Sequence, residues 1–125
     1  MNVVDSSGWL EYLSDGVNAD YFALPIKDEA NLATPTICIY EVFKRVLLEL
    51  GEERALDAAG IMSRGTVVEL NQQDAIEAAR LSAQLKLAMA DSIILATARA
   101  HEATLWTEDA HFKDVEGVRY IEKNR

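Results

Sequence analysis

The stretch Met89–Ala98 constrains the fold more than any other part of this 125-residue chain. Its residues are apolar on almost every side of a helix, and a helix of this kind belongs in the interior of a protein. Asp91 nevertheless lies near its start. An acid in the first turn can cap free N–H groups and lies favourably in the helix dipole. The alternative is that the helix carries Asp91 into a pocket with other carboxylates, and both interpretations are open at this point.

Composition is typical of a globular protein. Half of the residues are hydrophobic, and we expect residues 1–125 to form a single domain with its own core. No apolar run is long enough to span a membrane, and the N-terminus soon meets a charge at Asp5, unlike a signal peptide. Cys38 is the only cysteine, which excludes an intrachain disulfide and favours a reducing cytoplasm.

The net charge of −9 restricts the classes of partner. A passive nucleic-acid binder normally presents a basic face, so this class is disfavoured. The acidity can serve solubility, or it can come partly from acids gathered at a site that a cation neutralises. In either case it leaves room for a basic partner.

Strand-like and helix-like segments alternate along the chain. We expect strands at 2–5, 32–34, 66–70, 103–107 and 118–121. We expect helices at 6–14, 19–24, 36–50, 52–63, 72–85 and 89–100, one helical turn at 110–113 and a polar tail at 122–125. This alternation predicts a parallel sheet with helices on both faces.

Three local features refine the helices. Pro25 is expected to close the second helix. The helix at 36–50 is expected to carry one apolar face, made of Tyr40, Phe43, Leu47 and Leu50. Small residues on the helix at 72–85 predict close contacts with a neighbouring helix, and they are Ala75, Ala78, Ala79 and Ser82.

Four acids fall where an α/β protein builds its site, because ligands of parallel sheets bind beyond the carboxyl ends of the strands. Asp5 ends the first strand, and Asp109 follows the fourth. Asp91 opens the helix that leads into the fourth strand. Glu41 lies about one turn into the helix after the second strand.

Each acid also has a plain structural explanation. Asp5 and Asp109 can cap the turns that follow them, and Glu41 can pair with basic residues on the next turn of its helix. The apolar neighbours of Glu41 and Asp91 disfavour solvated acids. Like charges raise each other's pKa, so a carboxylate cluster is costly unless a cation joins it. Oxygen ligands of this kind suit Mg²⁺ or Mn²⁺, which favours metal-dependent phosphodiester hydrolysis.

Four segments of the chain resemble, in order, the successive motifs of a PIN domain. They are Val3-Val4-Asp5-Ser6-Ser7, Tyr40-Glu41-Val42, the stretch from Met89 to Ala98, and Leu105-Trp106-Thr107-Glu108-Asp109-Ala110-His111-Phe112. No single motif is specific, but four in this order are, and they cover essentially the whole chain. The short chain is similar, more narrowly, to the VapC-type toxins of bacterial toxin–antitoxin pairs.

This resemblance implies a fold, an activity and partners. The fold is a three-layer α/β/α sandwich with a five-stranded parallel sheet. The activity is that of an endoribonuclease dependent on Mg²⁺ or Mn²⁺, acting as the toxin of a type II toxin–antitoxin system. The partners are a structured RNA, a cognate VapB-type antitoxin that masks the groove and places a basic side chain near the acids, and a second copy in a homodimer. Helices at 36–63 are a candidate dimer interface.

The resemblance also implies roles for single residues. The catalytic acidic cluster comprises Asp5, Glu41, Asp91 and Asp109. We expect Asp5 and Asp91 to bind metal most directly. Glu41 and Asp109 are further candidate ligands that position water or hold a second ion. Ser6 and Thr107 are expected to be supporting hydroxyls near the metal.

Few basic residues lie near the motifs, which favours recognition of a structured RNA by shape. Lys86 is the first candidate for RNA contact, followed by Lys44 and Arg99. Each of them is also explained as a solvated surface charge. Glu108 departs from the family pattern, and we expect it at the rim, outside the site.

The remaining chemistry-bearing residues are expected to be structural. The two histidines, His101 and His111, are not at metal-ligand spacing and are interpreted as incidental, although His111 sits close to Asp109 and could touch substrate. Cys38 is expected to be a buried small hydrophobe. The two tryptophans are expected in the core, and not as stacking platforms for bases.

Three alternatives stay open. A PIN nuclease of RNA processing or quality control would differ from a toxin only in genomic context. A degenerate PIN scaffold without activity is disfavoured by the presence of all four acids. A receiver-like signalling domain needs paired acids early in the chain and a lysine at a late strand end. Asp5 has no acidic neighbour, and the fourth strand ends in Thr107-Glu108.

Overall fold

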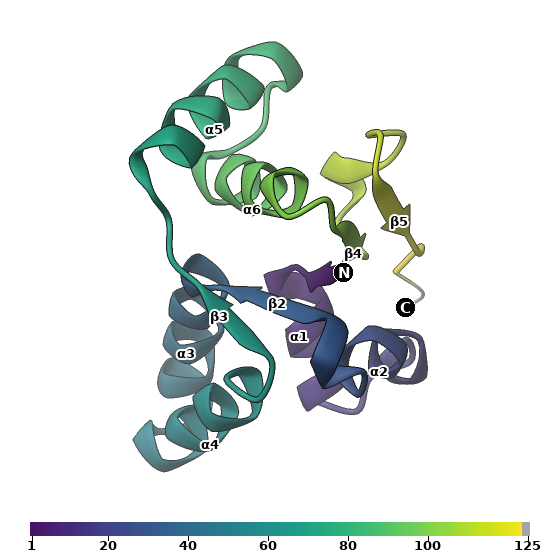
Figure 1. The fold of residues 1–125 in the computed structure, drawn as a ribbon. Helices are drawn as coiled ribbons and strands as arrows, with labels where there is room; N and C mark the ends of the chain where they lie inside the picture. Colours follow the sequence, from purple (N-terminus) through teal and green to yellow (C-terminus); the bar gives the residue numbers. More distant parts are fainter. Residues whose placement is uncertain (124–125) are drawn as a thin grey trace.

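The computed structural model describes residues 1–123 and contains a five-stranded parallel sheet (Figure 1). The strands are β1 (Asn2–Val4), β2 (Leu32–Pro35), β3 (Thr66–Val68), β4 (Thr104–Thr107) and β5 (Val118–Tyr120). Their order across the sheet is β3-β2-β1-β4-β5, and every neighbouring pair is parallel. Of the polar tail expected at 122–125, residues 124 and 125 lie outside the described part.

Helices cover both faces of this sheet. They are α1 (Ser6–Leu13), α2 (Ala19–Ile26), α3 (Thr36–Leu50), α4 (Glu52–Met62), α5 (Gln72–Leu85) and α6 (Met89–Ala100), with short 3₁₀ turns η1 (Glu29–Asn31) and η2 (Ala110–Phe112). Figure 1 shows α5 and α6 on one side and α1 to α4 on the other. The expected α/β/α sandwich is confirmed.

The centre of the sheet lies in the core. Val3 and Val4 of β1 are fully buried, because helices cover both faces and the strand must be apolar on both. Val4 pairs with Trp106 of β4, so Asp5 and Thr107, one residue further along, lie side by side where both strands end. The register of the two central strands therefore builds the floor of the acidic edge.

The edge strands are shorter than expected. β3 ends at Val68, before the expected Leu70, and β5 ends at Tyr120, before Ile121. Each edge strand has a neighbour on one side only. Pairing therefore ends where that single neighbour turns away.

Pro25 does not close α2, contrary to expectation. The helix continues to Ile26 and is capped at Lys27. Pro25 and Ile26 are both buried. Loss of one N–H near the end of a helix is tolerated here because the last turn packs into the core.

The prediction of which face of α3 packs against the rest of the protein is wrong. Tyr40 is 59% exposed and Leu50 is 61% exposed. The buried positions are Cys38 and Val42, one turn apart on an adjoining stripe. Both stripes have helical spacing, and only contact with the sheet determines which one is buried.

The small residues of α5 do not give uniformly close packing. Ala78 is buried, but Ala75 and Ala79 are exposed and line an apolar hollow of about 490 Å³ between α5 and α6. Met89 and Ile93 line the α6 side of this hollow. Small side chains permit a close approach of helices but do not enforce it.

Among the described residues, no single helix is long and apolar enough to cross a membrane. Taken together, α5 and α6 reach the required length and composition, but they are bent by 118° at the break between them.

Candidate active site

The structure brings the four acids together at the carboxyl edge of the sheet. Asp5 follows β1, Asp109 follows β4, Glu41 lies in the second turn of α3, and Asp91 lies in the first turn of α6. The charges of Asp109 and Glu41 both act on Asp91, and the charge of Asp109 acts on Asp5. The sequence prediction that these acids share one site therefore agrees with the structure.

Asp5 is the most deeply placed acid, with 2% of its surface exposed. Its Oδ1 accepts hydrogen bonds from the Ser7 hydroxyl at 2.7 Å and from the Gly8 N–H at 2.9 Å, so Asp5 also caps α1. Its Oδ2 accepts a hydrogen bond from the Thr107 hydroxyl. Burial raises the pKa of Asp5 to about 6, even though these three donors lower it.

Asp91 is half-buried and makes no capping contact in the first turn of α6, where Ala88 is the N-cap residue. Burial, followed by the charges of Asp109 and Glu41, raises the pKa of Asp91 to about 6. Of the two interpretations open from the sequence, the structure favours the shared pocket, because no side-chain bond from Asp91 caps the helix.

Glu41 is held by α1 and not by its own helix. Its Oε1 accepts a hydrogen bond from the Ser6 hydroxyl at 2.6 Å. Arg45, the residue one turn later on α3, pairs instead with Glu49. The expected supporting role of Ser6 thus takes the form of fixing Glu41.

Asp109 and Thr107 form the turn after β4. The Thr107 hydroxyl, which donates to Asp5, accepts the Asp109 N–H at 2.9 Å. Asp109 Oδ1 in turn accepts the N–H of His111 at 2.9 Å and caps η2. Thr107 therefore contacts two acids through one hydroxyl, and its expected role near a metal stays a prediction.

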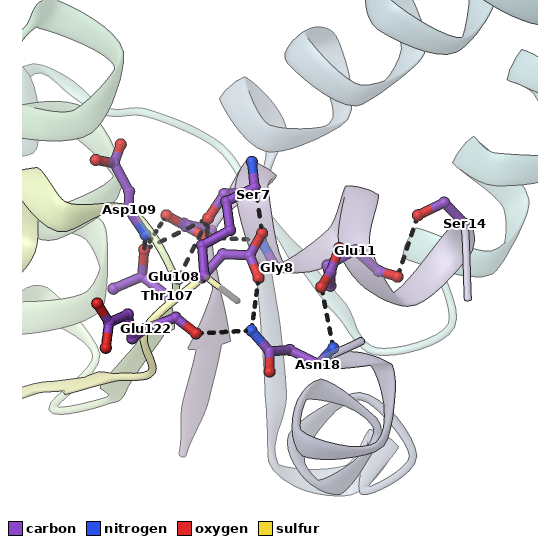
Figure 2. Close-up of polar contacts among 11 residues, drawn as sticks. Ser7, Gly8, Glu11, Ser14, Asn18, Thr107, Glu108, Asp109 and Glu122 are labelled. Atoms are coloured by element: carbon purple, nitrogen blue, oxygen red, sulfur yellow. Dashed lines mark hydrogen bonds and ion pairs between the residues drawn. The ribbon is translucent and has the colours of Figure 1, made fainter. Parts of the chain in front are cut away.

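Ser7 is a site residue that the sequence reasoning missed. Its hydroxyl contacts Asp5, lies 3.5 Å from the Thr107 hydroxyl and accepts the Glu108 N–H at 3.4 Å. Figure 2 shows Ser7, Thr107 and Asp109 converging from α1 and β4. The doublet Ser6-Ser7 was the available signal, because consecutive residues at a helix start can reach two different acids.

Glu108 does not lie at the rim, contrary to expectation, and only 4% of its surface is exposed. Its Oε1 accepts a hydrogen bond at 3.1 Å from the side-chain amide of Asn18, which also donates to the Glu122 carbonyl (Figure 2). The Lys123 ammonium lies 3.8 Å from its other oxygen. A charge at a loop position can be buried when distant segments supply donors, which sequence spacing does not reveal.

His111 lies beside two of the acids. Its Nδ1 lies 2.9 Å from Asp109 Oδ1, and the ligand atoms of Asp91, Asp109 and His111 all lie within 4.8 Å of one another. Metal-ligand motifs describe residues that are close in the sequence. They do not detect this group, because Asp91 belongs to α6 and His111 to η2.

The three candidate RNA-contact residues differ in their position relative to the acids. Lys44 lies over the Tyr40 ring, in a hollow of about 320 Å³ that also contains Ser6 and Glu41. Lys86 caps the C-terminus of α5, five residues before Asp91. Arg99 lies in the last turn of α6, at the opposite end from Asp91, and donates to the Glu116 carbonyl. The structure thus brings Lys44, but not Arg99, beside the acids.

Cys38 and both tryptophans are buried, as expected. Cys38 is fully buried on α3. Trp9 is fully buried and Trp106 is 6% exposed, so neither presents an open face to a nucleic-acid base.

The donor set fits a hard divalent cation. Carboxylates from four segments gather at one edge, and the two with resolved shifts have a pKa raised to about 6. Such an arrangement is repulsive without a cation and favourable with one. Carboxylate oxygens are the ligands that Mg²⁺ and Mn²⁺ prefer.

In open parallel α/β sheets, the edge beyond the carboxyl ends of the strands, where the acids gather here, is where ligands bind. Residues 3–118 match the family model of the PIN domain. The chain belongs to the PIN domain family, as its motifs indicated.

Solved structures share the fold over nearly the whole chain. A toxin–antitoxin complex from Klebsiella pneumoniae is 24% identical, with a TM-score of 0.82, and the match covers 98% of this chain and 100% of the other. VapC20 of Mycobacterium tuberculosis, described as a sarcin–ricin loop cleaving toxin, is 14% identical, with a TM-score of 0.78 and 98% of each chain covered. VapBC from Salmonella typhimurium, bound to DNA, is 20% identical, with a TM-score of 0.73 and 98% of each chain covered. The search of curated proteins found no match.

Proposed function

We propose that this protein is an endoribonuclease dependent on Mg²⁺ or Mn²⁺ and that it acts as the toxin of a type II toxin–antitoxin pair. The observation that carries the proposal is the convergence of Asp5, Glu41, Asp91 and Asp109 at one edge of a PIN fold. The similarity of the fold to toxins such as VapC20 supports the choice of RNA as substrate and of a toxin as the biological role.

The acids have distinct roles in this proposal. Asp91 and Asp109 hold the ion, because their carboxylates belong to one group of converging ligand atoms. Direct binding of metal by Asp5, as expected from the motifs, stays a prediction. Its oxygens accept hydrogen bonds from Ser7, Gly8 and Thr107, so in this proposal it adds negative charge beneath the other two acids. Bound Mg²⁺ or Mn²⁺ supplies a Lewis acid that stabilises charge on the phosphate and promotes ionisation of water.

Glu41 is the acid best placed to take a proton. The Ser6 hydroxyl holds one of its oxygens at 2.6 Å and so fixes the carboxylate at the site. Its other oxygen can accept a proton from the attacking water while the oxygen of that water forms a bond to phosphorus; the bond from phosphorus to the leaving oxygen then breaks, and the leaving oxygen takes a proton from solvent. Ser6 orients this base, which agrees with the hydroxyl role implied by the family.

RNA contact is proposed at the hollow beside Glu41. Lys44 and Tyr40 line it together with Ser6, so a cation and an aromatic ring lie next to the acids. Lys86 remains a candidate at the start of α6, and Arg99 is the weakest because of its place at the far end. With so few cations, we propose a structured RNA substrate recognised largely by its shape.

Cleavage of total cellular RNA by the purified protein tests the nuclease. We expect discrete fragments with Mg²⁺ or Mn²⁺, loss of cleavage with a chelator, and loss in Asp91→Asn. The matched control is Asp57→Asn, an exposed aspartate on α4. Cleavage that survives both the chelator and Asp91→Asn would refute the metal mechanism. Absence of cleavage with any divalent ion would favour a degenerate scaffold.

An antitoxin partner is proposed for the groove between α1 and the α3–α4 pair. The groove has a volume of about 220 Å³, and its apolar lining comprises Leu10, Leu13, Val46, Leu50, Ala58 and Ile61. Leu10 also lines the hollow that contains Glu41, so the two depressions are contiguous. An apolar segment in this groove would place a basic residue at the acids, and the net charge of −9 favours a basic partner.

The gene next to this one decides the biological role. We expect it to encode a small DNA-binding protein whose product co-purifies with this chain and blocks RNA cleavage. Leu10→Glu should weaken that complex at the groove. Absence of such a gene would favour the alternative, a PIN nuclease of RNA processing or quality control.

A homodimer is proposed through the exposed apolar side chains of α3. Leu47 and Leu48 are 39% and 75% exposed. Adjacent exposed apolar side chains mark surfaces at which proteins associate, and a second copy of the chain would cover these. Light scattering on a sizing column tests this, and Leu48→Lys should shift a dimer to a monomer.

A further inference from the structure

One of the three converging potential metal ligands is a nitrogen donor and not a carboxylate. His111 lies in η2, directly after the β4 turn, and its Nδ1 is 2.9 Å from Oδ1 of Asp109. Its ligand atom converges with those of Asp91 and Asp109. The four-acid description of the site therefore leaves one potential donor without a role.

The structure holds this imidazole in place although it is open to solvent. The His111 backbone N–H donates to Asp109 Oδ1 at 2.9 Å, and the following residue, Phe112, is fully buried. Phe112 thus anchors the turn in the core, while 79% of the His111 side chain remains exposed. A histidine that is fixed by its backbone and open at its ring is available to a ligand.

The distances suit a single ion. Ligand bonds of about 2.1 Å place two donors of one ion about 3 Å apart when they are adjacent and about 4 Å apart when they are opposite. The Nδ1–Oδ1 separation of 2.9 Å matches adjacent donors. The upper limit of 4.8 Å within the group of three exceeds the separation of opposite donors by less than about 1 Å, and a rotation of the exposed imidazole can supply this adjustment.

We propose that His111 binds the divalent ion through nitrogen, together with Asp91 and Asp109, and that this nitrogen makes the site prefer Mn²⁺ to Mg²⁺. The inference rests on the proposed metal-dependent function. Mg²⁺ demands oxygen ligands, whereas transition-metal ions also accept imidazole nitrogen. Nδ1 would bind the ion through its lone pair, so any proton on Nδ1 would pass to solvent and the neutral imidazole would carry its proton on Nε2.

The chain has two histidines and therefore offers a matched control. His111 lies beside Asp91, near the start of α6, and His101 lies at the other end of α6. His101 follows the C-terminus of α6, whereas Asp91 is in the first turn. His111→Gln and His101→Gln therefore make the same chemical change near to and far from the acids. Because the His111 side chain is largely exposed, we expect both variants to fold, and circular dichroism without metal checks this.

The experiment loads the full chain with Mn²⁺ and records pulsed electron paramagnetic resonance, with calorimetric titration of Mn²⁺ and Mg²⁺ in parallel. We expect the coupling of a directly bound ¹⁴N in the wild type and in His101→Gln, and its loss in His111→Gln. The Mn²⁺ dissociation constant should rise about tenfold or more in His111→Gln, as is usual when an outer contact or ligand of a metal is removed. The Mg²⁺ constant should change less than about threefold.

The outcomes separate this inference from the proposed function. Mn²⁺ that binds with no ¹⁴N coupling, or with coupling that persists in His111→Gln, overturns the role of His111 and leaves the acid site intact. Mn²⁺ that fails to bind the wild type, or binds Asp91→Asn equally well, overturns the proposed metal site and the inference with it. Equal losses of Mn²⁺ and Mg²⁺ affinity in His111→Gln overturn the selectivity.

Discussion

Asp5 gives the sharpest test of the electrostatics of the site. Its pKa is raised from 3.8 to about 6, because burial of the carboxylate outweighs its three hydrogen bonds. A difference of about two pKa units corresponds to about 3 kcal/mol at about 1.4 kcal/mol per unit. In the absence of a metal ion, ionised Asp5 therefore destabilises the folded protein by up to about 3 kcal/mol.

The sign of the pH dependence follows from linkage. Below about pH 4, Asp5 is protonated in both the folded and the unfolded chain, so its burial as a charge does not lower the free energy of unfolding. Between about pH 4 and pH 6, the unfolded chain releases the proton first, so stability falls as pH rises; above about pH 6 the loss is complete. With a chelator present, we expect the contribution of Asp5 to the free energy of unfolding to decrease between about pH 4 and pH 6 and to stay constant at higher pH.

Asp5→Asn removes the charge and keeps the shape. Asparagine caps a helix about as well as aspartate, so the contact with the Gly8 N–H is retained. We expect this variant to match the wild type near pH 4 and to be more stable by up to about 3 kcal/mol near pH 7.5. In a chain of this size that corresponds to roughly 10 °C in melting temperature.

Urea unfolding at the two pH values, with a chelator present, measures the difference. Asp57→Asn, an exposed site, serves as the control and should change stability by no more than about 0.5 kcal/mol at either pH. Asp5→Asn that is clearly less stable than the wild type at pH 7.5 would refute the reasoning. Asp5 would then be a structural acceptor whose charge its donors stabilise.

Three further outcomes are expected. Thr107→Val should cost about 1–3 kcal/mol and impair cleavage, while Thr107→Ser retains both, since the hydroxyl bridges two acids. Gly8→Ala should destabilise the folded protein by about 2–3 kcal/mol, because a methyl group there lies 2.6 Å from a buried valine. Gly60→Ala should stabilise it by up to about 1 kcal/mol, because a methyl group there meets nothing within 4 Å. Urea unfolding measures both variants. Mn²⁺ should raise the melting temperature of the wild type but not that of Asp91→Asn, and an equal rise in both would contradict binding at the acids.

Much of the candidate site was predictable because two rules can be applied to the sequence directly. A period of two residues or of 3.6 residues distinguishes strands from helices, and parallel strands end at one edge. Asp5 and Asp109 follow strand ends, so their position at one edge of the sheet could be predicted, whereas their proximity depends on the pairing of β1 with β4. Asp91 and Glu41 were identified by apolar neighbours that leave a solvated acid unexplained.

Other features depended on which segments meet. Two stripes of α3 have helical spacing, and only the sheet decided that Val42 is buried while Tyr40 is exposed. Glu108 is buried because Asn18 reaches it from the α1–α2 turn, ninety residues away. His111 joins Asp91 although neither spacing nor composition connects them.

The sequence by itself determined the strands, the helices and the edge at which the acids gather, because periodicity and chain direction are local properties of consecutive residues. Only the tertiary structure decided that His111 lies beside Asp91 and Asp109, which face of α3 is buried and which groups contact Glu108, because each depends on the distance between segments far apart in the chain. The free energy of such contacts comes from burial and from charge at short range, and neither acts until the chain has folded.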